Sequence, residues 1–383
     1  MERIALAYSG GLDTSVAIPW LMDHYHVDVI AVTVDLGQGK ELEDVRDVRD
    51  VRDRALAAGA ARAHVLDARE EFASDYVLRA LKADALYEDR YPMAASLSRP
   101  LIARKLVEIA GIEQAFAIAH GATGEGHDQV GFDVTARALN PALHVIAPAR
   151  EWGMARSEVV DYARARGIPV PVTIERSYRA EANLWGRTIS WGVLDDPWTE
   201  PPEAVYTLTK SPAGCPDQPA YVEIAFERGV PTAINGVEMP MLDLIASLAT
   251  LAGAHGVGRI DMVENRPEGT KSRAVYEAPA AVVLHGAHKE LQKMVTTKEA
   301  GRVSRAISLR YADAVFNGMW FTPLRDALDA CVQTIQERVT GAIRVKLCKG
   351  DCRIVGRQSP HALRDHAPAT PEVVHAFDPA VTR

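Results

Sequence analysis

The sequence is poor in cysteine and has no long apolar run, and each absence excludes a class of protein. Its 383 residues include 4 cysteines, all in the second half and without histidines at zinc-finger spacing, so reduced, structural thiols are expected. Lys-Gly-Asp between Cys348 and Cys352 is typical of a turn between strands. No apolar stretch is long enough to cross a bilayer, and the N-terminus lacks the apolar region of a signal peptide. We therefore expect a cytoplasmic protein without a membrane partner.

Basic residues are outnumbered by acidic ones. The 43 lysines and arginines against 51 aspartates and glutamates give a formal net charge of −8. Such a balance is unfavourable for a surface that tracks a nucleic acid, so no nucleic-acid partner is expected.

A glycine turn near the N-terminus is the most informative motif. Residues 7–15 read Ala-Tyr-Ser-Gly-Gly-Leu-Asp-Thr-Ser directly after the apolar residues 4–6, which predicts a strand that leads into a helix. Consecutive glycines let backbone N–H groups approach an anion, and the start of a helix attracts negative charge. The turn has no lysine and matches neither the P-loop nor the G-x-G-x-x-G motif. It is similar to the pyrophosphatase loop of enzymes that cleave ATP between the α and β phosphates.

The side chains of this turn suit the same chemistry. Ser9 and Thr14 add hydroxyl donors, and Asp13 is placed to cap the helix or to hold Mg²⁺ on the phosphates. The alternative is an ordinary strand-to-helix turn, because Gly-Gly and Asp-Thr are common turn and cap residues.

The first half alternates short apolar runs with helical stretches, which predicts an α/β fold with a doubly wound parallel sheet. Candidate strands cover residues 4–7, 27–34, 63–67, 114–119 and 144–147. Polar loops follow three of these strands, at residues 9–11, 35–39 and 120–124. Because ligands bind at the carboxyl ends of parallel strands, we expect the three loops to build one site.

The second half is less regular and is expected to be α+β. A helix is predicted at residues 241–253, with closing strands near 343–347 and 353–356. Proline and glycine at residues 167–171 mark the exit from the first domain. We therefore divide the chain into domains at 1–168 and 169–358, followed by a short tail at 359–383.

Motifs in a fixed order closely resemble those of the argininosuccinate synthase family, over residues 3–358. They are the glycine turn, Asp-Leu-Gly-Gln-Gly at 35–39, His-Gly-Ala-Thr-Gly at 120–124, Arg-Ile-Asp-Met-Val-Glu-Asn-Arg at 259–266 and Lys-Ser-Arg-Ala-Val-Tyr-Glu at 271–277. The resemblance implies an adenine nucleotide alpha hydrolase-like ATP-pyrophosphatase domain, followed by a synthetase and multimerisation domain.

The resemblance also implies a two-step ligation with ATP, Mg²⁺, citrulline and aspartate. The ureido oxygen of citrulline attacks the α-phosphate, pyrophosphate leaves, and the amino group of aspartate displaces AMP. The protein's task is to hold three ligands in line and to stabilise charge on the phosphates.

Site residues carry over from the family by position. The resemblance implies that ATP binds at Ala7, Tyr8, Ser9, Gly10, Gly11, Leu12, Asp13, Thr14, Ser15, Val34 and Gly121, and that Ser9, Asp13 and Asp128 act in catalysis. Aspartate is expected at Thr123 and Asp128, and the acceptor at Tyr91, Ser96, His127, Gly131, Arg179, Thr188, Glu264 and Tyr276. Taken singly, each also has an ordinary structural interpretation: the tyrosines as packing residues, Glu264 as a surface carboxylate and Ser96 as a helix cap.

The acceptor positions depart from the family pattern. Residues 124–133 read Gly-Glu-Gly-His-Asp-Gln-Val-Gly-Phe-Asp, where the family usually has Gly-Lys-Gly-Asn-Asp-Gln-Val-Arg-Phe-Glu. His127 thus replaces an asparagine and Gly131 an arginine that holds the citrulline carboxylate, while Arg179 and Thr188 replace serines. The acceptor is therefore citrulline or an analogue, in arginine biosynthesis or in a specialised pathway.

The glycine turn is also compatible with two other functions. A nucleotide-binding homologue that has lost catalysis would bind ATP without releasing pyrophosphate. A tRNA-modifying enzyme is disfavoured by the excess of acidic residues and by the lack of a cysteine near the glycine turn.

The end of the chain bears on the oligomeric state. Family members carry a long C-terminal helix that reaches neighbouring subunits, whereas residues 361–383 contain prolines at 368, 371 and 379. A homo-oligomer is expected, as a dimer or a weakened tetramer.

Overall fold

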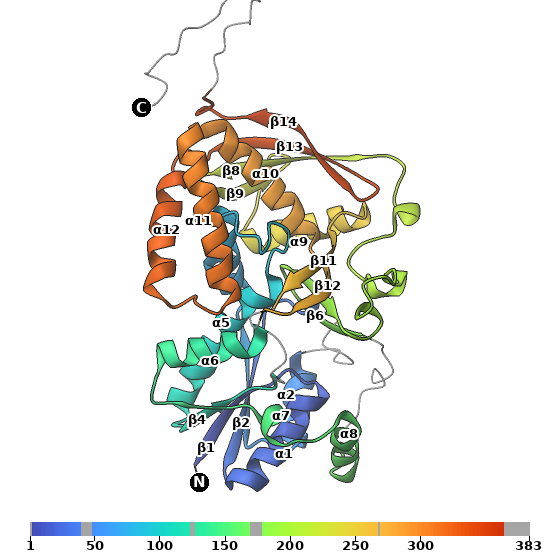
Figure 1. Cartoon of the computed structure of the whole chain (residues 1–383), viewed down its shortest axis with the longest axis vertical. Helices are drawn as coiled ribbons and strands as arrows, with labels where there is room; N and C mark the ends of the chain where they lie inside the picture. The colour runs from blue at the N-terminus through green and yellow to red at the C-terminus, as the bar shows by residue number, and fades with distance from the viewer. Residues whose placement is uncertain (1, 40–47, 123–126, 169–177, 267–268, 364–383) are drawn as a thin grey trace, which may run out of the picture.

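The computed structural model describes residues 2–39, 48–122, 127–168, 178–266 and 269–363, with the backbone alone at 48, 49, 127, 128 and 179. The half with the N-terminus is built on a parallel sheet, and the other half on antiparallel sheets (Figure 1). No helix in these ranges is long and apolar enough to cross a membrane. The Thr123 position and the tail beyond residue 363 lie outside the described residues.

The parallel sheet has the strand order β3-β2-β1-β4-β5. Its half of the chain contains β1 (Arg3–Ala7), α1 (Leu12–Tyr25), β2 (Asp28–Asp35), α2 (Val48–Ala57), β3 (Arg62–Asp67), α3 (Arg69–Glu71), the π-helix η2 (Phe72–Val77), α4 (Leu78–Lys82), α5 (Ala94–Ile112), β4 (Ala117–Ala119), α6 (His127–Leu139), β5 (His144–Ile146), α7 (Pro148–Glu151) and α8 (Arg156–Ala165). All five strands run parallel, as the alternating pattern predicted. The strand expected at 114–119 begins only at Ala117, because Gln114 has a φ of 54° in the turn that ends α5.

Alternate residues of these strands face opposite helical layers. Ile4 and Leu6 pack in one hydrophobic cluster with residues of α1 and α2, whereas Ala5 packs in another with residues of α5. This alternation is what a strand imposes, since successive side chains point to opposite faces of a sheet. The parallel sheet is therefore packed against helices on both faces.

The second half has two antiparallel sheets, ordered β10-β9-β8-β13-β14 and β11-β12-β7-β6. Its elements are β6 (Arg179–Asn183), β7 (Gly186–Ser190), η4 (Gly192–Leu194), η5 (Glu203–Val205), η6 (Pro212–Gly214), β8 (Ala220–Glu227), β9 (Val230–Ile234), β10 (Val237–Glu238), α9 (Met241–Ala254), β11 (Arg259–Asn265), β12 (Lys271–Glu277), α10 (Pro279–Val295), α11 (Lys298–Phe316), α12 (Pro323–Gln336), β13 (Gly341–Cys348) and β14 (Asp351–Gln358). The helix and closing strands expected there are present as α9, β13 and β14, and Cys348 and Cys352 flank the β13–β14 turn.

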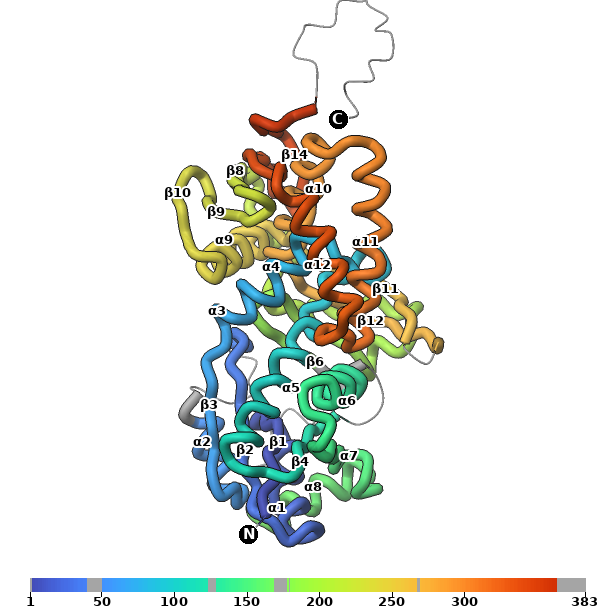
Figure 2. The backbone as a smooth tube through the Cα atoms, turned by 90° about the vertical axis from the view of Figure 1, so that its left-hand side faces the viewer, coloured from blue at the N-terminus to red at the C-terminus, as the bar shows by residue number. Residues whose placement is uncertain are grey.

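A segment of the first half completes the core of the second. After β3 the chain passes through α3, η2 and α4 alongside α9 and α12 before it returns as α5 (Figure 2). Tyr76 stacks on Trp320 with ring centroids 4.7 Å apart, and Tyr87 stacks on Phe316 at 3.4 Å. The two halves therefore share one continuous hydrophobic cluster, which extends from Ala5 to Leu347.

Candidate functional site

The glycine turn between β1 and α1 has the conformation of an anion-binding loop. Gly10 has a φ of 80°, a value that favours glycine, and Gly11 precedes the first turn of α1. The hydroxyls of Ser9 and Thr14 lie 3.1 Å apart, and Thr14 Oγ1 accepts the Ser9 N–H at 3.3 Å. No side chain in the described residues caps the start of α1, so its N–H groups face the turn unblocked.

Below the turn, buried hydroxyls fix its base. Tyr8 Oη lies 3.0 Å from Ser15 Oγ, and Thr33 Oγ1 donates to the Tyr8 carbonyl at 2.9 Å. Burial raises the pKa of Tyr8, so its phenol stays protonated at neutral pH.

Asp13 forms an ion pair instead of capping the helix. Arg156, the first residue of α8, donates from Nη1 to Asp13 Oδ1 at 2.6 Å. The Asp13 side chain is 27% exposed and that of Arg156 is 55% exposed, so both reach solvent beside the glycine turn. A guanidinium group from a distant helix thus supplies the positive charge that the lysine-free turn lacks.

The other ATP positions meet the turn at the carboxyl edge of the sheet. Because β1 pairs with both β2 and β4, Val34, the last residue but one of β2, and Gly121, two residues beyond β4, lie near the strand ends on either side of β1. Gly121 has no room for a side chain, since an added Cβ would lie 2.8 Å from Thr14 Cγ2. The described parts of the three predicted loops therefore follow neighbouring strands of one sheet, and that they bind ATP together stays a prediction.

A hairpin of the second half touches the same edge. The Leu184 N–H, in the turn between β6 and β7, donates to the Leu36 carbonyl at 2.9 Å. Gly37, with a φ of 82°, lies so close that an added Cβ would be 2.9 Å from Leu184 Cβ. The hairpin thus links the carboxyl edge to the sheet that lines the next pocket.

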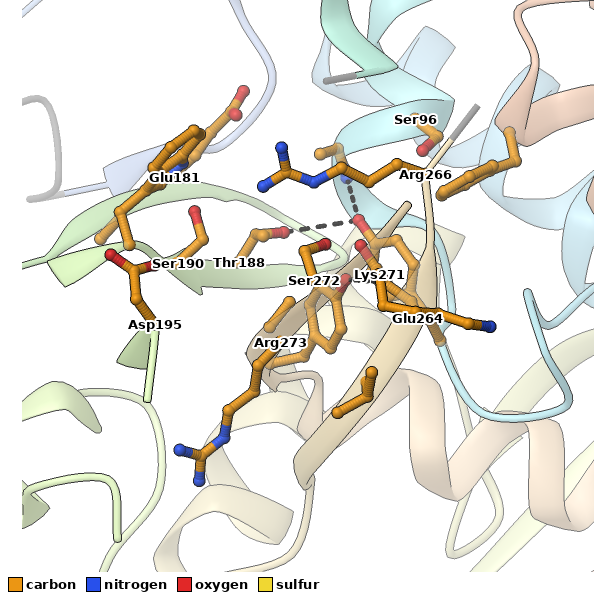
Figure 3. A pocket seen from close by; sticks show the side chains of 18 of the residues that line it. Ser96, Glu181, Thr188, Ser190, Asp195, Glu264, Arg266, Lys271, Ser272 and Arg273 are labelled. Atoms are coloured by element: carbon orange, nitrogen blue, oxygen red, sulfur yellow. Dashed lines mark hydrogen bonds between the residues drawn. The ribbon is translucent and has the colours of Figure 1, made fainter. Parts of the chain in front are cut away.

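That pocket has a volume of about 350 Å³ and lies among α5, β6, β7, β11 and β12 (Figure 3). It brings together the predicted acceptor residues Tyr91, Ser96, Thr188, Glu264 and Tyr276. It is also lined by side chains to which the sequence assigned no role, among them Glu181, Ser190, Trp191, Arg266, Lys271, Ser272 and Arg273. Arg266 and Lys271 belong to the sequence motifs at residues 259–266 and 271–277. Whether their side chains point into the pocket depends on the strand register, which cannot be derived from a single sequence.

Strand register explains how three of these residues meet. Tyr276 on β12 pairs opposite Thr188 on β7, and β11 flanks β12 on its other side with Glu264 opposite Ser272. Side chains of one parity share a face of a sheet, so Thr188, Tyr276 and Glu264 all point into the pocket.

Two hydrogen-bonded groups in the pocket lining are joined by stacked tyrosine rings. Tyr276 Oη donates to Glu264 Oε2 at 2.5 Å, and the Tyr276 ring stacks on Tyr91 with centroids 3.9 Å apart. Tyr91 Oη accepts the Ala95 N–H at 3.1 Å and lies 3.4 Å from Thr188 Oγ1. Burial raises the pKa of both tyrosines, so they serve as neutral donors.

Glu264 is a buried acid, not the surface carboxylate that the simpler interpretation allowed. Only 6% of the surface of Glu264 is exposed to solvent. Burial raises the pKa of Glu264 to about 7, and the nearby Glu88 adds to the effect, while the Tyr276 hydroxyl and Arg266 act against it. A group that ionises near neutrality inside a pocket is suited to receive a cation.

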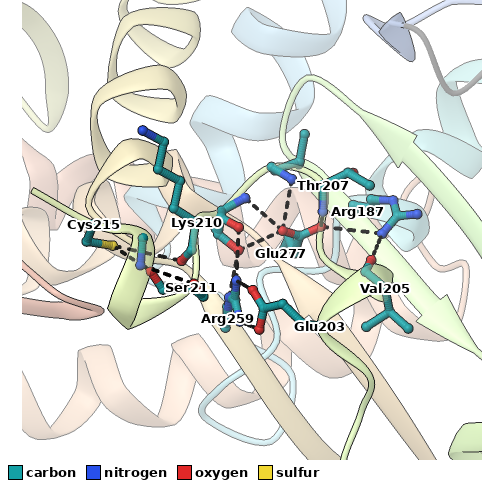
Figure 4. Close-up of polar contacts among 12 residues, drawn as sticks. Arg187, Glu203, Val205, Thr207, Lys210, Ser211, Cys215, Arg259 and Glu277 are labelled. Carbon is teal, nitrogen blue, oxygen red and sulfur yellow. Dashed lines mark hydrogen bonds and ion pairs between the residues drawn. The ribbon is translucent and has the colours of Figure 1, made fainter.

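A second buried carboxylate, Glu277 at the end of β12, connects this sheet to a neighbouring loop (Figure 4). Its oxygens accept the N–H groups of Thr207, Leu208 and Thr209 at 2.8, 2.9 and 2.9 Å. Arg187 on β7 lies 3.4 Å away. Because this charge is fully buried and compensated, we assign it to holding the 207–209 loop against the sheet, not to binding a ligand.

Gly131 lies away from the pocket lining, at the contact between α6 and α5. An added Cβ would lie 2.9 Å from Arg99 Cβ, and Gly318 packs against the same backbone. Arg99 in turn donates to Glu181 Oε2 at 2.6 Å. The position at which the family has an arginine is therefore a close contact between α6 and α5 in this protein.

The remaining predicted positions are less fully described. Ser96 lies inside α5, not at its cap, and borders the pocket. His127 and Asp128 begin α6 and Arg179 begins β6, but their side chains, like Thr123, lie outside the described part of the chain. Their proposed roles stay predictions. Within the described residues, no group of three or more His, Cys, Asp or Glu side chains is arranged to hold a metal ion.

Together the fold and the site define a nucleotide-binding α/β protein with a second, α+β half. Comparisons with known proteins identify the family. The family description "Arginosuccinate synthase N-terminal HUP domain" matches residues 3–169, and "Arginosuccinate synthase C-terminal domain" matches residues 178–383. The chain belongs to the argininosuccinate synthase family.

Individual relatives agree over nearly the whole length. The chain is 51% identical to argininosuccinate synthase of Gloeobacter violaceus, a match that covers 98% of this chain and 94% of the relative. It is 48% identical to that of Oceanobacillus iheyensis, covering 98% and 89% respectively. A solved structure, described as a predicted subunit of a tRNA methyltransferase from Methanocaldococcus jannaschii, overlaps 43% of this chain and 75% of its own at a TM-score of 0.30 and 11% identity, too distant to bear on function.

Proposed function

We propose that the protein is an AMP-forming carbon–nitrogen ligase of the argininosuccinate synthase type, which couples citrulline or a citrulline analogue to the amino group of aspartate. One observation carries the proposal. The glycine turn, with its unblocked helix start, and a separate polar pocket with a buried acid are joined by the same β6–β7 hairpin. Relatives that are about half identical over 98% of the chain carry the name of this enzyme.

The glycine turn is proposed to bind the phosphates of ATP. The N–H groups at the start of α1 have no side-chain cap, and a helix start favours an anion. The hydroxyls of Ser9 and Thr14, which contact each other and the Gly11 backbone, are proposed to turn towards the phosphates when ATP binds. Arg156 stands at the edge of this space and is proposed to stabilise the charge of departing pyrophosphate.

Mg²⁺ is proposed to accompany ATP. Asp13 offers one carboxylate beside the turn, which fits an ion that is usually held by one or two carboxylates together with phosphate oxygens. When bound, the ion would neutralise phosphate charge and help to orient the nucleotide.

The pocket among β7, β11 and β12 is proposed to bind the ureido acceptor. Glu264, once ionised, pairs with an α-ammonium group, and the neutral Tyr91, Ser96, Thr188 and Tyr276 supply hydroxyls for the polar ends of the molecule. Aspartate is proposed to bind near Thr123 and Asp128, in line with the family positions.

The proposed reaction has two steps. The ureido oxygen of the acceptor attacks the α-phosphorus of ATP, the bond to the β-phosphate oxygen breaks, and pyrophosphate leaves. The aspartate amino group then attacks the activated ureido carbon, loses a proton, and AMP departs with the former ureido oxygen. The protein contributes by positioning the reactants, so no covalent enzyme intermediate is required.

Phosphorus NMR of the reaction products tests this proposal. With ATP, Mg²⁺, citrulline and aspartate we expect AMP and pyrophosphate, and mass spectrometry should detect argininosuccinate. Formation of ADP and phosphate contradicts the proposed cleavage. ATP binding without pyrophosphate release, with citrulline or any ureido analogue, would instead indicate a homologue that acts by association.

We further propose that the enzyme works in the cytoplasm as a homo-oligomer, a dimer or a tetramer that dissociates on dilution. Light scattering across a dilution series measures the assembly. A tetramer that persists at nanomolar protein contradicts it.

A further inference from the structure

Arg266 places a guanidinium group across the pocket just described. It follows β11 directly, two residues after Glu264, so the two opposite charges start from the same side of the strand. In Figure 3 the Arg266 side chain extends from β11 towards the β6–β7 side of the cavity. Its Cζ lies 5.2 Å from the centre of the Trp191 ring.

The other cations of the pocket already have hydrogen-bond partners within the protein. Arg273 donates to Asp261 Oδ2 at 2.6 Å and to the carbonyls of Asp196 and Thr199, and Lys271 donates to Asn265. Within the described part of the chain, the Arg266 guanidinium forms neither a hydrogen bond nor an ion pair; its contact there is the indole of Trp191. Arg266 therefore offers all its guanidinium donors to a ligand, whereas Arg273 and Lys271 already share theirs with the protein.

Trp191, which contacts the Arg266 guanidinium, has an unusual backbone conformation. Its φ is 73° and its ψ is 168°, a backbone conformation that is unfavourable for a bulky residue. The turn that follows is fixed by the Gly192 N–H, which donates to Asp195 Oδ2 at 3.0 Å. This arrangement keeps an aromatic face beside the guanidinium, and such a face restrains its plane.

The chemistry of this pair identifies what it would bind. A guanidinium with free donors recognises a carboxylate through two parallel hydrogen bonds. With Glu264 nearby to receive an ammonium group, the pocket presents the two charges that an α-amino acid head group requires. The arginine that serves the carboxylate elsewhere in the family cannot be supplied from Gly131, which is packed against the Arg99 side chain.

We propose that Arg266, held beside Trp191, binds the α-carboxylate of the acceptor and makes the pocket selective for acceptors that carry one. This inference rests on the proposed function, because it assigns a substrate group to the same site. It makes Arg266 a specificity-determining residue of the enzyme.

The test compares acceptors with and without the carboxylate. Arg266→Gln and Arg266→Lys are assayed by pyrophosphate release with citrulline and with its decarboxylated analogue 4-ureidobutylamine. With citrulline, KM should rise about tenfold or more in Arg266→Gln and less in Arg266→Lys, while KM for the analogue stays within about twofold of wild type. An equal loss with both acceptors overturns the proposal.

Two further measurements separate this inference from the proposed function. Arg302→Gln is the control, because that arginine pairs with Glu299 on the exposed side of α11, and its KM values should match wild type. Calorimetric titration with citrulline, without ATP, reports binding independently of turnover. Binding by wild type that is lost in Arg266→Gln supports the inference even if no product forms. Equal binding by both proteins, or no binding by wild type, overturns it.

Discussion

At the scale of single residues, the acceptor pocket contains a buried ionisable group. Glu264 illustrates this, because the sequence allowed it to be a surface carboxylate, whereas β11 and β12 bury it against Tyr276. Burial disfavours its ionised form, so its pKa of about 7 links acceptor binding to pH.

We expect the acceptor KM to fall as pH rises through about 7, because Glu264 must be ionised to pair with an ammonium group. Glu264→Gln should raise this KM and abolish that part of its pH dependence. Steady-state kinetics between pH 5.5 and 8.5 test both statements. An unchanged pH profile in the variant would show that another group titrates.

The same residue predicts a change in stability with pH. Since the folded pKa is raised, the folded state keeps a proton that the unfolded state releases, and stability declines as pH rises from about 4.5 to about 7. Relative to wild type, Glu264→Gln should gain at most about 3 kcal/mol in the free energy of unfolding between pH 4.5 and pH 8. Urea denaturation at both pH values measures the difference. A constant difference contradicts the buried acid.

Arg156 gives a second prediction at this scale. Arg156→Gln should lower kcat/KM for ATP about tenfold or more, because it removes the cation beside the glycine turn, and Arg156→Lys should retain part of the activity. Arg166→Gln, at the other end of α8, is the matched control, since Arg166 pairs with Asp23. Asp13→Ala should abolish turnover with an unchanged melting temperature. Normal kinetics in Arg156→Gln would limit Arg156 to a structural ion pair.

At the scale of elements, the departure at position 131 is a packing feature. The sequence suggested that Gly131 replaces an arginine that holds the citrulline carboxylate in the family. The structure places the Gly131 backbone against Arg99 of α5 and against Gly318, where no side chain fits without movement. Substitution at this position alone would separate α6 from α5 before it could build a carboxylate site.

Gly131→Ala should therefore destabilise the protein by about 1–3 kcal/mol, although alanine favours helices. Gly301→Ala is the control within α11, because an added Cβ there meets no atom within 4 Å, and it should stabilise by up to about 1 kcal/mol. Chemical denaturation measures both changes. Equal effects of the two substitutions would mean that α5 and α6 separate at low cost.

At the scale of the whole molecule, the two halves are joined by residues 72–93. Gln336 of α12 donates to the Lys82 carbonyl at 2.9 Å, and Arg79 donates to Asp329 at 2.8 Å. His285 Nδ1 lies 3.2 Å from Asp84, and Tyr87 donates to the Asn265 carbonyl at 3.0 Å. A segment from the first half thus fills the core of the second and delivers Tyr91 to the pocket.

We expect the full chain to unfold in one cooperative transition, and a fragment starting at residue 178 to remain unfolded when expressed alone, because it lacks the apolar side chains of residues 72–93. Circular dichroism and calorimetry of both proteins test this. A fragment that folds with a sharp transition would show that the halves are independent.

The sequence by itself determined the parallel sheet, the glycine turn that follows its first strand, and the family. These follow from local patterns: apolar runs that alternate with helices, two glycines after a strand, and ordered motifs. Only the tertiary structure decided that Arg156 meets Asp13, that Arg266 crosses the pocket and that Gly131 is a helix contact. Each of these depends on segments distant in the chain being brought together by strand register and core packing, and no local pattern records such long-range contacts.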